Sequence, residues 1–329
     1  MRRAMAEADV GDDLREGDPT TRRLEMMAAE LLGLEGSLFV PSGTMANLIA
    51  VIVHTAQGSG IVIEAEAHIV TAEAGSIANL TDAVPYPVEG KYGVMASDEV
   101  AAAFDRAKAD GVRIGALCLE NTHNNAGGTL VSQEDMKRLI SLGHKHGAAV
   151  HVDGARIFNA SVALNVPAAK LVEGADSAMF CVSKGLGAPV GSVLCGAADF
   201  IAQARRARTW CGGGMRQSGV IAAAGIIGLK DYKERFAADH AHARRLAEGL
   251  LSLSAFEIDL RSVQTNMVYV CVRDPNFEPA AFDRHCYERG IWVKANRERF
   301  RFVLHHQVSA SDVNQAIDVI KQFFAASAH

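Results

Sequence analysis

The sequence lacks a cysteine framework, an excess of charge of either sign and a long apolar run. Its six cysteines are scattered without a Cys-x-x-Cys pair, so we expect buried free thiols in a reducing compartment rather than disulfides or a zinc site. The 33 basic and 38 acidic residues give a formal charge of −5, which offers no reason to expect a nucleic-acid or membrane partner.

Membrane-spanning and secreted classes are also disfavoured. No apolar run approaches the roughly 18 residues of a membrane span, and the first residues do not form the apolar stretch of a signal peptide. Hydrophobic residues make up 49% of the chain and charged residues 22%, which excludes disorder and a simple coiled coil. We therefore expect a globular, cytoplasmic protein.

The length of 329 residues suggests about two domains. The sequence indicates an N-terminal arm over residues 1–12, a large domain over 13–229 and a small α+β domain over 230–329. Near this second boundary, a Cys-Gly-Gly-Gly break at 211–214 is followed by longer helices and fewer strands.

Apolar runs that alternate with helical patterns predict a mostly parallel sheet, covered on both faces, in the large domain. The predicted strands are residues 37–40, 61–64, 114–120, 148–152, 178–182 and 192–196. Helices are expected at 44–55, 132–146 and 220–229. In the small domain we expect helices at 231–251, 279–289 and from 309 onward, and strands at 267–273 and 301–304.

Three polar motifs follow predicted strands of the large domain. The first is Asp153, which ends an apolar strand and precedes a Gly-Ala-Arg turn. Open α/β sheets bind ligands at the carboxyl ends of their strands, and a carboxylate there needs a cation or a donor. A structural pair between Asp153 and Arg156 explains the motif equally well on its own.

The second motif is Lys184, which follows the strand at 178–182 and precedes a glycine-rich loop at 185–191. A lysine at a strand end, with small residues around it, suits a Schiff-base nucleophile. Taken alone, a surface loop lysine is the commoner explanation.

The third motif is Ser42-Gly43-Thr44, which opens a helix directly after a strand. The free N–H groups and the dipole of a helix start attract a phosphate, although an ordinary serine cap is the commoner case. Together, an anion cradle, a lysine and a carboxylate at one sheet edge match the needs of pyridoxal 5′-phosphate (PLP), whose ring nitrogen must stay protonated to accept electrons.

Several longer motifs resemble those of the low-specificity L-threonine aldolases over nearly the whole chain. They are residues 12–13, 18–20, 41–47, 120–124, 151–160, 183–192 and 212–218. The resemblance implies a PLP-dependent transferase-like fold (fold type I), with a seven-stranded sheet in a PLP-binding large domain. It also implies a homotetramer or a dimer with shared active sites.

The resemblance assigns cofactor contacts residue by residue. Lys184 would carry PLP as a Schiff base, Asp153 would pair with the pyridine nitrogen, and His68 would stack on the ring. Gly43 and Thr44, at the helix start opened by Ser42, would bind the phosphate, with Arg216 as a weaker candidate. Arg156 would also contact the cofactor.

The resemblance also implies substrate contacts. Arg156 and Arg301 would bind the substrate carboxylate, while His123 and Glu73 would line the side of the β-hydroxyl. We expect His123 to be the base, acting directly or through a water. Family members also carry a Ser-Asp-Thr segment that contacts this carboxylate. We expect the contact to be missing here or supplied by other groups.

The implied reaction is retro-aldol cleavage of L-threonine, L-allo-threonine or a related β-hydroxy-α-amino acid to glycine and an aldehyde, acetaldehyde in the case of threonine. Another fold-type-I PLP enzyme, such as a β-eliminating lyase or an aminotransferase, stays open, as does a catalytically weak PLP-binding protein. No metal is expected, because the His144 and His146 pair does not share a helix face.

Overall fold

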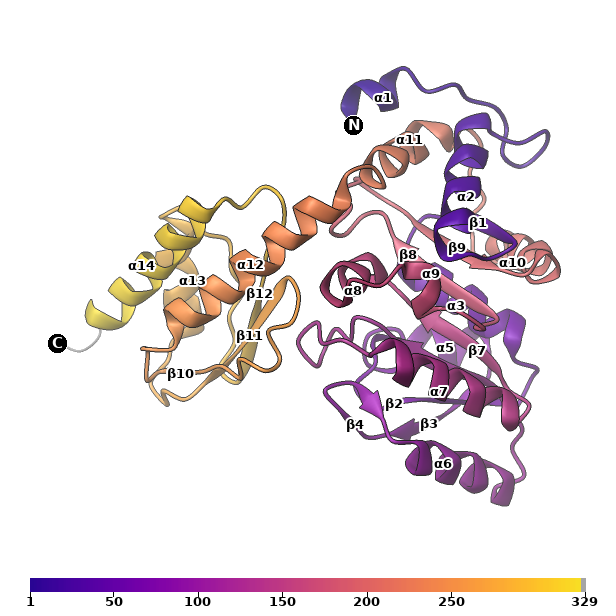
Figure 1. The fold of residues 1–329 in the computed structure, drawn as a ribbon, viewed down its shortest axis with the longest axis horizontal. Coiled ribbons are helices and arrows are strands. Elements are labelled where there is room, and N and C mark those ends of the chain that lie inside the picture. Colours follow the sequence, from indigo (N-terminus) through magenta and orange to yellow (C-terminus); the bar gives the residue numbers. More distant parts are fainter. Residues whose placement is uncertain (327–329) are drawn as a thin grey trace. The chain divides into compact units, whose positions relative to one another are not determined.

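The computed structural model describes residues 1–326 and divides the chain into two compact units (Figure 1). The large unit comprises Met1–Asn125 and Leu130–Tyr232, while the small unit comprises Ala126–Thr129 and the chain from Lys233 onward. The sequence did not predict that residues 126–129, which lie between two stretches of the large unit in the sequence, belong to the small unit. Among the described residues, no helix combines the length and the apolar character needed to cross a membrane.

A seven-stranded sheet forms the centre of the large unit, in the order β1-β9-β8-β7-β6-β2-β3. Neighbouring strands from β3 to β8 are parallel, and β9 is antiparallel to both β8 and β1. The strands are β1 (Gly36–Val40), β2 (Gly60–Glu64), β3 (Val84–Val88), β6 (Ile114–Glu120), β7 (Ala149–Asp153), β8 (Ser177–Cys181) and β9 (Ser192–Gly196).

Helices cover both faces of this sheet (Figure 1). One face carries α3 (Gly43–His54), α5 (Ala74–Leu80) and α10 (Ala198–Trp210). The other carries α2 (Pro19–Leu32), α6 (Ser97–Ala109), α7 (Gln133–Lys145), α8 (Ile157–Leu164) and α9 (Ala168–Leu171). Helices α1 (Arg2–Ala6) and α11 (Gly219–Gly228) pack with each other, and α11 also packs on α2. Smaller elements are α4 (His68–Thr71) and a hairpin of β4 (Gly90–Lys91) and β5 (Val94–Met95).

The register brings the carboxyl ends of several strands together at one end of the sheet. Glu120 at the end of β6 pairs with Asp153 at the end of β7, and Asp153 pairs with Met179 in β8. Because β9 is antiparallel to both β1 and β8, these two strands run the same way. Ser192 of β9 is opposite both Val40, which ends β1, and Cys181, which ends β8. The segments that follow β1, β7 and β8 therefore leave the sheet at the same edge.

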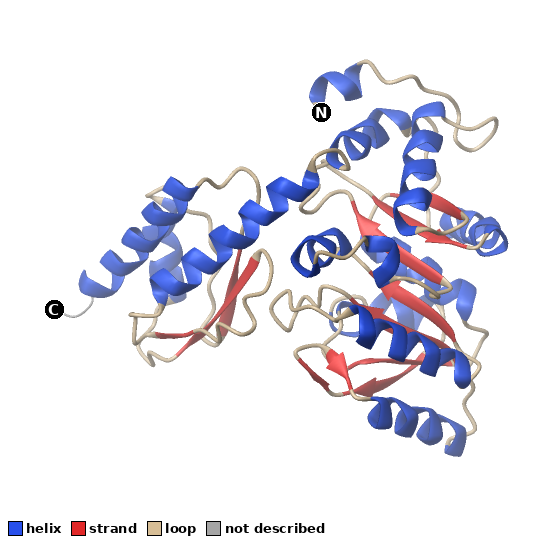
Figure 2. Ribbon diagram, in the orientation of Figure 1, coloured by secondary structure: helices blue, strands red, loops and turns tan. Residues whose placement is uncertain are grey.

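In the described residues, the small unit has a three-stranded antiparallel sheet, two long helices and one shorter helix (Figure 2). The strands are β10 (Phe256–Glu257), β11 (Met267–Val272) and β12 (Arg299–Val303), and the helices are α12 (Tyr232–Leu250), α13 (Pro279–Tyr287) and α14 (Ala310–Ala326). A cluster of phenylalanine rings fills its core, with Phe256 at 4.9 Å from Phe324 and Phe282 at 5.7 Å from Phe300, measured between ring centroids. The mostly parallel sheet of seven strands and the small α+β unit confirm the predicted fold class.

Candidate active site

A pocket of about 340 Å³ lies at the sheet edge where β1, β7 and β8 end. Seven of the residues predicted from the sequence line it together: Ser42, Gly43, Thr44, His68, Glu73, Asp153 and Lys184. These seven come from four segments of the chain, which end or follow β1, β2, β7 and β8, and the common direction of these strands explains why they converge.

One end of the pocket is the start of helix α3. Ser42 caps this helix, and its Oγ accepts a hydrogen bond from the Met45 N–H at 3.2 Å. A Cβ on Gly43 would lie 2.9 Å from the Cys181 Sγ and 3.0 Å from the Met179 Cε, so only glycine lets the helix start approach β8 this closely. The first N–H groups of a helix have no partner within it, and here they border a cavity of suitable size for a phosphate.

The pocket also contains a buried carboxylate, that of Asp153, which suits a positively charged partner. Asp153 has only 3% of its surface exposed. Its Oδ1 accepts a hydrogen bond from the Ala155 N–H at 3.0 Å, and its Oδ2 accepts one from the Asn47 Nδ2 at 2.8 Å. A buried carboxylate is stable only with donors or a cation beside it, and a protonated ring nitrogen would supply that cation.

His68 and Glu73 form an ion pair in the pocket when His68 is protonated. The His68 Nδ1 lies 2.7 Å from the Glu73 Oε1. Its hydrogen bond to Glu73 is the main cause that raises the pKa of His68, against the opposing effect of burial. The Asn47 Nδ2 lies 3.3 Å from the same Glu73 oxygen. The ligand-type atoms of His68, Glu73 and Asp153 lie within 4.8 Å of one another, so two buried carboxylates and one imidazole meet in the pocket.

Lys184 enters the pocket from the turn after β8. The Gly191 carbonyl anchors this turn by accepting hydrogen bonds from the N–H groups of Val182 and Ser183, at 3.1 and 3.2 Å. The Lys184 charge acts on both walls of the pocket. It opposes the rise in the pKa of His68, and it opposes the effect of burial, which raises the pKa of Cys181. The pocket thus combines an amine, a carboxylate and an anion cradle.

His123 does not line the pocket, although the sequence predicted it as the base. Its side chain is fully buried, and its Nε2 lies 2.8 Å from the Glu64 Oε2. Burial lowers the pKa of His123, but the Glu64 hydrogen bond and the charges of nearby carboxylates outweigh it, so the pKa is raised overall. Any transfer of a proton between His123 and a ligand in the pocket therefore needs an intermediary.

Two predicted arginines in the large unit also lie outside the pocket lining. Arg156 precedes the first residue of α8 and follows the lining residue Ala155, and its Nη1 donates to the Asn124 Oδ1 at 3.3 Å. Arg216 forms an ion pair with Asp12, more than half of its side chain being exposed.

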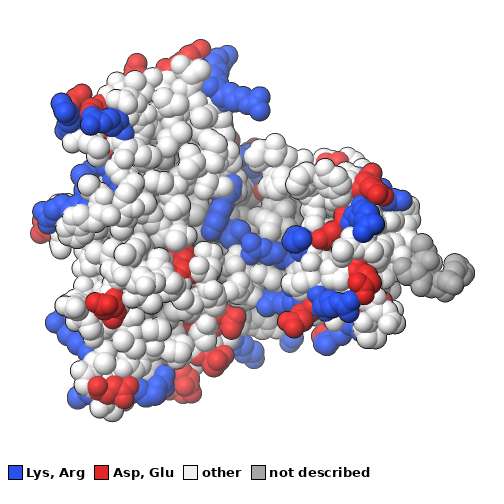
Figure 3. Space-filling view, turned by 180° about the vertical axis from the view of Figure 1, so that it is seen from behind, with Lys and Arg blue, Asp and Glu red and all other residues white. Residues whose placement is uncertain are grey.

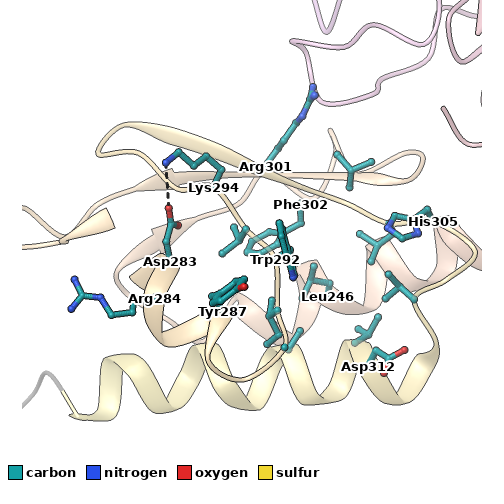
Figure 4. A pocket seen from close by; sticks show the side chains of 18 residues that line it. Leu246, Asp283, Arg284, Tyr287, Trp292, Lys294, Arg301, Phe302, His305 and Asp312 are labelled. Carbon is teal, nitrogen blue, oxygen red and sulfur yellow. Dashed lines mark ion pairs between the residues drawn. The ribbon is translucent and has the colours of Figure 1, made fainter. Parts of the chain in front are cut away.

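Arg301 belongs to the small unit, on strand β12. Its Nη1 lies 3.5 Å from the Tyr269 Oη, and the side chain borders a separate cavity of about 1010 Å³. Figure 4 shows the guanidinium pointing away from the other labelled side chains of that cavity.

Three important residues were not assigned from the sequence. Glu120 accepts hydrogen bonds from the N–H groups of His68 and Asn124, at 2.6 and 2.7 Å, and so holds the segments that carry them. Glu64 orients His123, and Asn47 bridges Glu73 and Asp153. The signal for both glutamates was present, since each ends an apolar strand as Asp153 does.

The fold and the pocket define a PLP enzyme of fold type I. The model of the beta-eliminating lyase family matches residues 1–273. The low-specificity L-threonine aldolase 1 of Arabidopsis thaliana is 41% identical over 330 residues, covering 98% of this chain and 92% of that protein. The low specificity L-threonine aldolase of Escherichia coli (strain K12) is 38% identical over 326 residues, covering 99% and 95%.

The chain therefore belongs to the beta-eliminating lyase family and, within it, to the low-specificity L-threonine aldolases. A solved structure of the Leishmania major threonine aldolase shares the fold, with a TM-score of 0.77 at 18% identity, covering 92% of this chain and 88% of that one.

Proposed function

We propose that the protein cleaves L-threonine, L-allo-threonine or related β-hydroxy-α-amino acids to glycine and an aldehyde, with PLP as its cofactor. The observation that carries this proposal is the convergence of Lys184, Asp153 and the start of α3 on one pocket. High identity to threonine aldolases favours this reaction over that of an aminotransferase or of another β-eliminating lyase.

The residues of the pocket fit PLP. Ser42, Gly43 and Thr44 would hold the phosphate at the helix start, and Asp153 would hold the ring nitrogen protonated. His68, kept charged by Glu73, would stack on the ring, and Lys184 would bind the aldehyde carbon. When bound, PLP supplies an electron sink for the bond that breaks at Cα.

The substrate carboxylate would be held by Arg156 and Arg301. Fixing it orients the Cα–Cβ bond for cleavage, which is a positioning effect rather than a chemical one. Arg216 remains our proposal for an additional phosphate contact, from a loop that would act across a subunit boundary. Glu73 would lie at the hydroxyl side of the substrate. Its carboxylate accepts a hydrogen bond from the His68 Nδ1.

The base for the substrate hydroxyl is, in our proposal, His123 acting through a water molecule. This role is supported by the raised pKa of His123 and by its pairing with Glu64, which stabilises the imidazole after it accepts a proton. Its complete burial makes the water necessary.

We further propose a cytoplasmic homotetramer, or a dimer with shared active sites. Six unpaired cysteines, four of them buried, support a reducing compartment. Acidic and basic side chains occur together at several places on the face seen in Figure 3, which supports a small-molecule substrate rather than a nucleic acid.

The experiment is to purify the protein with PLP and measure acetaldehyde released from L-threonine and from L-allo-threonine. Release from either substrate supports the proposal, and the ratio of the two rates gives its stereochemical tolerance. Binding of PLP without release from either substrate would contradict it and favour another PLP reaction or a catalytically weak PLP-binding protein.

A further inference from the structure

A chain of four hydrogen bonds leads from the pocket across the interface between α3 and the sheet. It joins the side chains of Asp153, Asn47, His151, Ser177 and His54. In order, the distances are 2.8 Å (Asn47 Nδ2 to Asp153 Oδ2), 3.1 Å (His151 Nε2 to Asn47 Oδ1), 2.9 Å (His151 Nδ1 to Ser177 Oγ) and 2.7 Å (His54 Nε2 to Ser177 Oγ). The first four of these residues are no more than 3% exposed.

The periodicities of helix and strand build this arrangement. Asn47 and His54 are seven residues apart on α3, so they lie on the same face of the helix. His151 and Asp153 are two residues apart on β7 and therefore face the same side of the sheet. Ser177 begins β8 and is paired in register with His151.

The carboxylates fix the orientation of the Asn47 amide. Its Nδ2 faces Asp153 at 2.8 Å and both oxygens of Glu73 at 3.3 and 3.4 Å. The opposite orientation would place an amide oxygen against two acidic groups. The Asn47 Oδ1 therefore faces His151, whose Nε2 must carry the hydrogen.

The directions of the remaining hydrogen bonds follow because the imidazoles of His151 and His54 are neutral. Burial, with a smaller contribution from His54, lowers the pKa of His151 to about 3, so its ring carries one proton. With that proton on Nε2, the Nδ1 accepts from the Ser177 hydroxyl. Ser177 in turn accepts from the His54 Nε2, and burial lowers the pKa of His54 to about 4. Every N–H and O–H that takes part in these four hydrogen bonds thus points toward Asp153.

We propose that Asn47, His151, Ser177 and His54 are positioning residues, which form a one-directional hydrogen-bond chain that ends on the Asp153 carboxylate and holds it aimed at the cofactor ring. The inference rests on the proposed function, since it concerns the carboxylate that would keep the ring nitrogen protonated. Hydrogen bonds in such a chain polarise one another, so a change at its far end reaches the carboxylate.

The proton positions can be tested directly by neutron diffraction from deuterated crystals of the holoenzyme. The expected result is a single deuteron at Nε2 on both His54 and His151. A deuteron at the Nδ1 of His151 would reverse the chain at that point and overturn the inference.

Graded variants test the coupling. We expect Asn47→Leu to lower kcat for threonine cleavage about tenfold or more, Ser177→Ala to lower it several-fold, and His54→Phe to have the smallest effect. The KM for threonine should change little in all three. The second readout is the ¹⁵N chemical shift of the labelled pyridine nitrogen of bound PLP, which should move toward the unprotonated value in the same order.

The His54 site allows a conservative rescue. His54→Phe keeps the ring stacked on Phe200, whose centroid is 4.7 Å away, but removes the donor. His54→Gln restores an N–H near the position of Nε2 and should restore both kcat and the ¹⁵N shift. His146→Phe is the matched control, because His146 is stacked on Phe104 at 4.4 Å, on the far side of the sheet from α3, and should change neither readout.

The two proposals fail in different ways. Absence of acetaldehyde release by the unaltered protein would contradict the proposed function. If that protein is active and loads PLP, but the Ser177 and His54 variants leave kcat and the ¹⁵N shift unchanged, the chain is structural and the inference is overturned.

Discussion

A cavity of the small unit is larger than the active-site pocket of the large unit, but the pocket contains the groups that can do chemistry. The cavity of the small unit measures about 1010 Å³ and is lined mainly by apolar side chains such as Leu246, Tyr287, Trp292 and Phe302 (Figure 4). The pocket of the large unit measures about 340 Å³ and contains an amine, an imidazole and two buried carboxylates. Burial of charged groups is costly, so their convergence, rather than the size of a cavity, marks the functional site.

Exposure shows the same contrast. Trp292 at the larger cavity is 83% exposed, and the nearby Lys294 meets Asp283 only at 3.9 Å. In the pocket, Glu73 and Asp153 are each 3% exposed and have short hydrogen bonds. Substitutions at the two cavities test whether their difference in chemistry is a difference in function.

The largest effect is expected for Lys184→Ala. Loss of the amine should abolish turnover and remove the visible absorbance of PLP bound to the protein, because no lysine remains to bind its aldehyde. Lys294→Ala, at the other cavity, is the matched control and should leave both unchanged. An unaltered visible spectrum in the Lys184 variant would contradict the assignment of the pocket.

Asp153→Asn should reduce kcat by on the order of 100-fold, since the amide cannot stabilise a positive ring nitrogen as a carboxylate does. Rates of acetaldehyde release at saturating threonine measure the loss. Asp283→Asn, in the small unit, serves as the control. Equal rates for the Asp153 variant and the unaltered protein would show that the carboxylate has no electronic role.

His123→Asn should reduce kcat roughly 100-fold while binding of PLP stays unchanged, if His123 takes the hydroxyl proton through a water. His68→Asn should weaken PLP binding instead, because the imidazole would stack on the ring. Steady-state kinetics with a titration of PLP separates the two results. A loss of kcat only in the His68 variant would transfer the role of base to His68.

Glu73→Gln should remove stability that depends on pH. The hydrogen bond to Glu73 raises the pKa of His68, so this pair stabilises the folded state fully below the ordinary histidine pKa of about 6.5, and the contribution is lost as pH rises through the folded pKa. Urea unfolding of both proteins should therefore show a larger difference in free energy at acidic than at alkaline pH. A difference that does not vary with pH would mean that Glu73 does not raise the pKa of His68 in the folded protein.

The smallest effect is expected for Trp292→Ala. This side chain is exposed and borders the larger cavity, so its removal should leave kcat and KM within about twofold and change stability by no more than about 0.5 kcal/mol. Kinetics and thermal unfolding measure both. A large loss of activity would show that the larger cavity contributes to the reaction.

Much of the large unit followed from the sequence, because strand ends and helix caps are local features. The predicted strands at 114–120 and 192–196 agree with β6 and β9 at both ends, and Ser132, the first residue of the helix predicted at 132–146, caps α7. Strand β3 was missed because Pro85 and Pro87 argue against a central strand. Its place at the sheet edge explains how the prolines are tolerated.

The rest depends on pairings between distant segments. Arg208 is buried because it reaches Asp13 at 2.8 Å and the Phe39 carbonyl at 2.9 Å, and no local pattern joins residues 195 positions apart. The role of Asn47 could not be predicted either, because its partner Asp153 is distant in the sequence. The sequence showed Asn47 only as part of a helix start. Its contact with Asp153 appears when α3 is placed against β7.

The most direct test of the account is to reduce the holoenzyme with borohydride, digest it and locate the pyridoxyl group by mass spectrometry. Reduction fixes the cofactor to the lysine that binds it. The account predicts that the label lies on the peptide that contains Lys184. A label on a different lysine, or none on a protein that has bound PLP, would contradict the assignment of the active site to the pocket of the large unit.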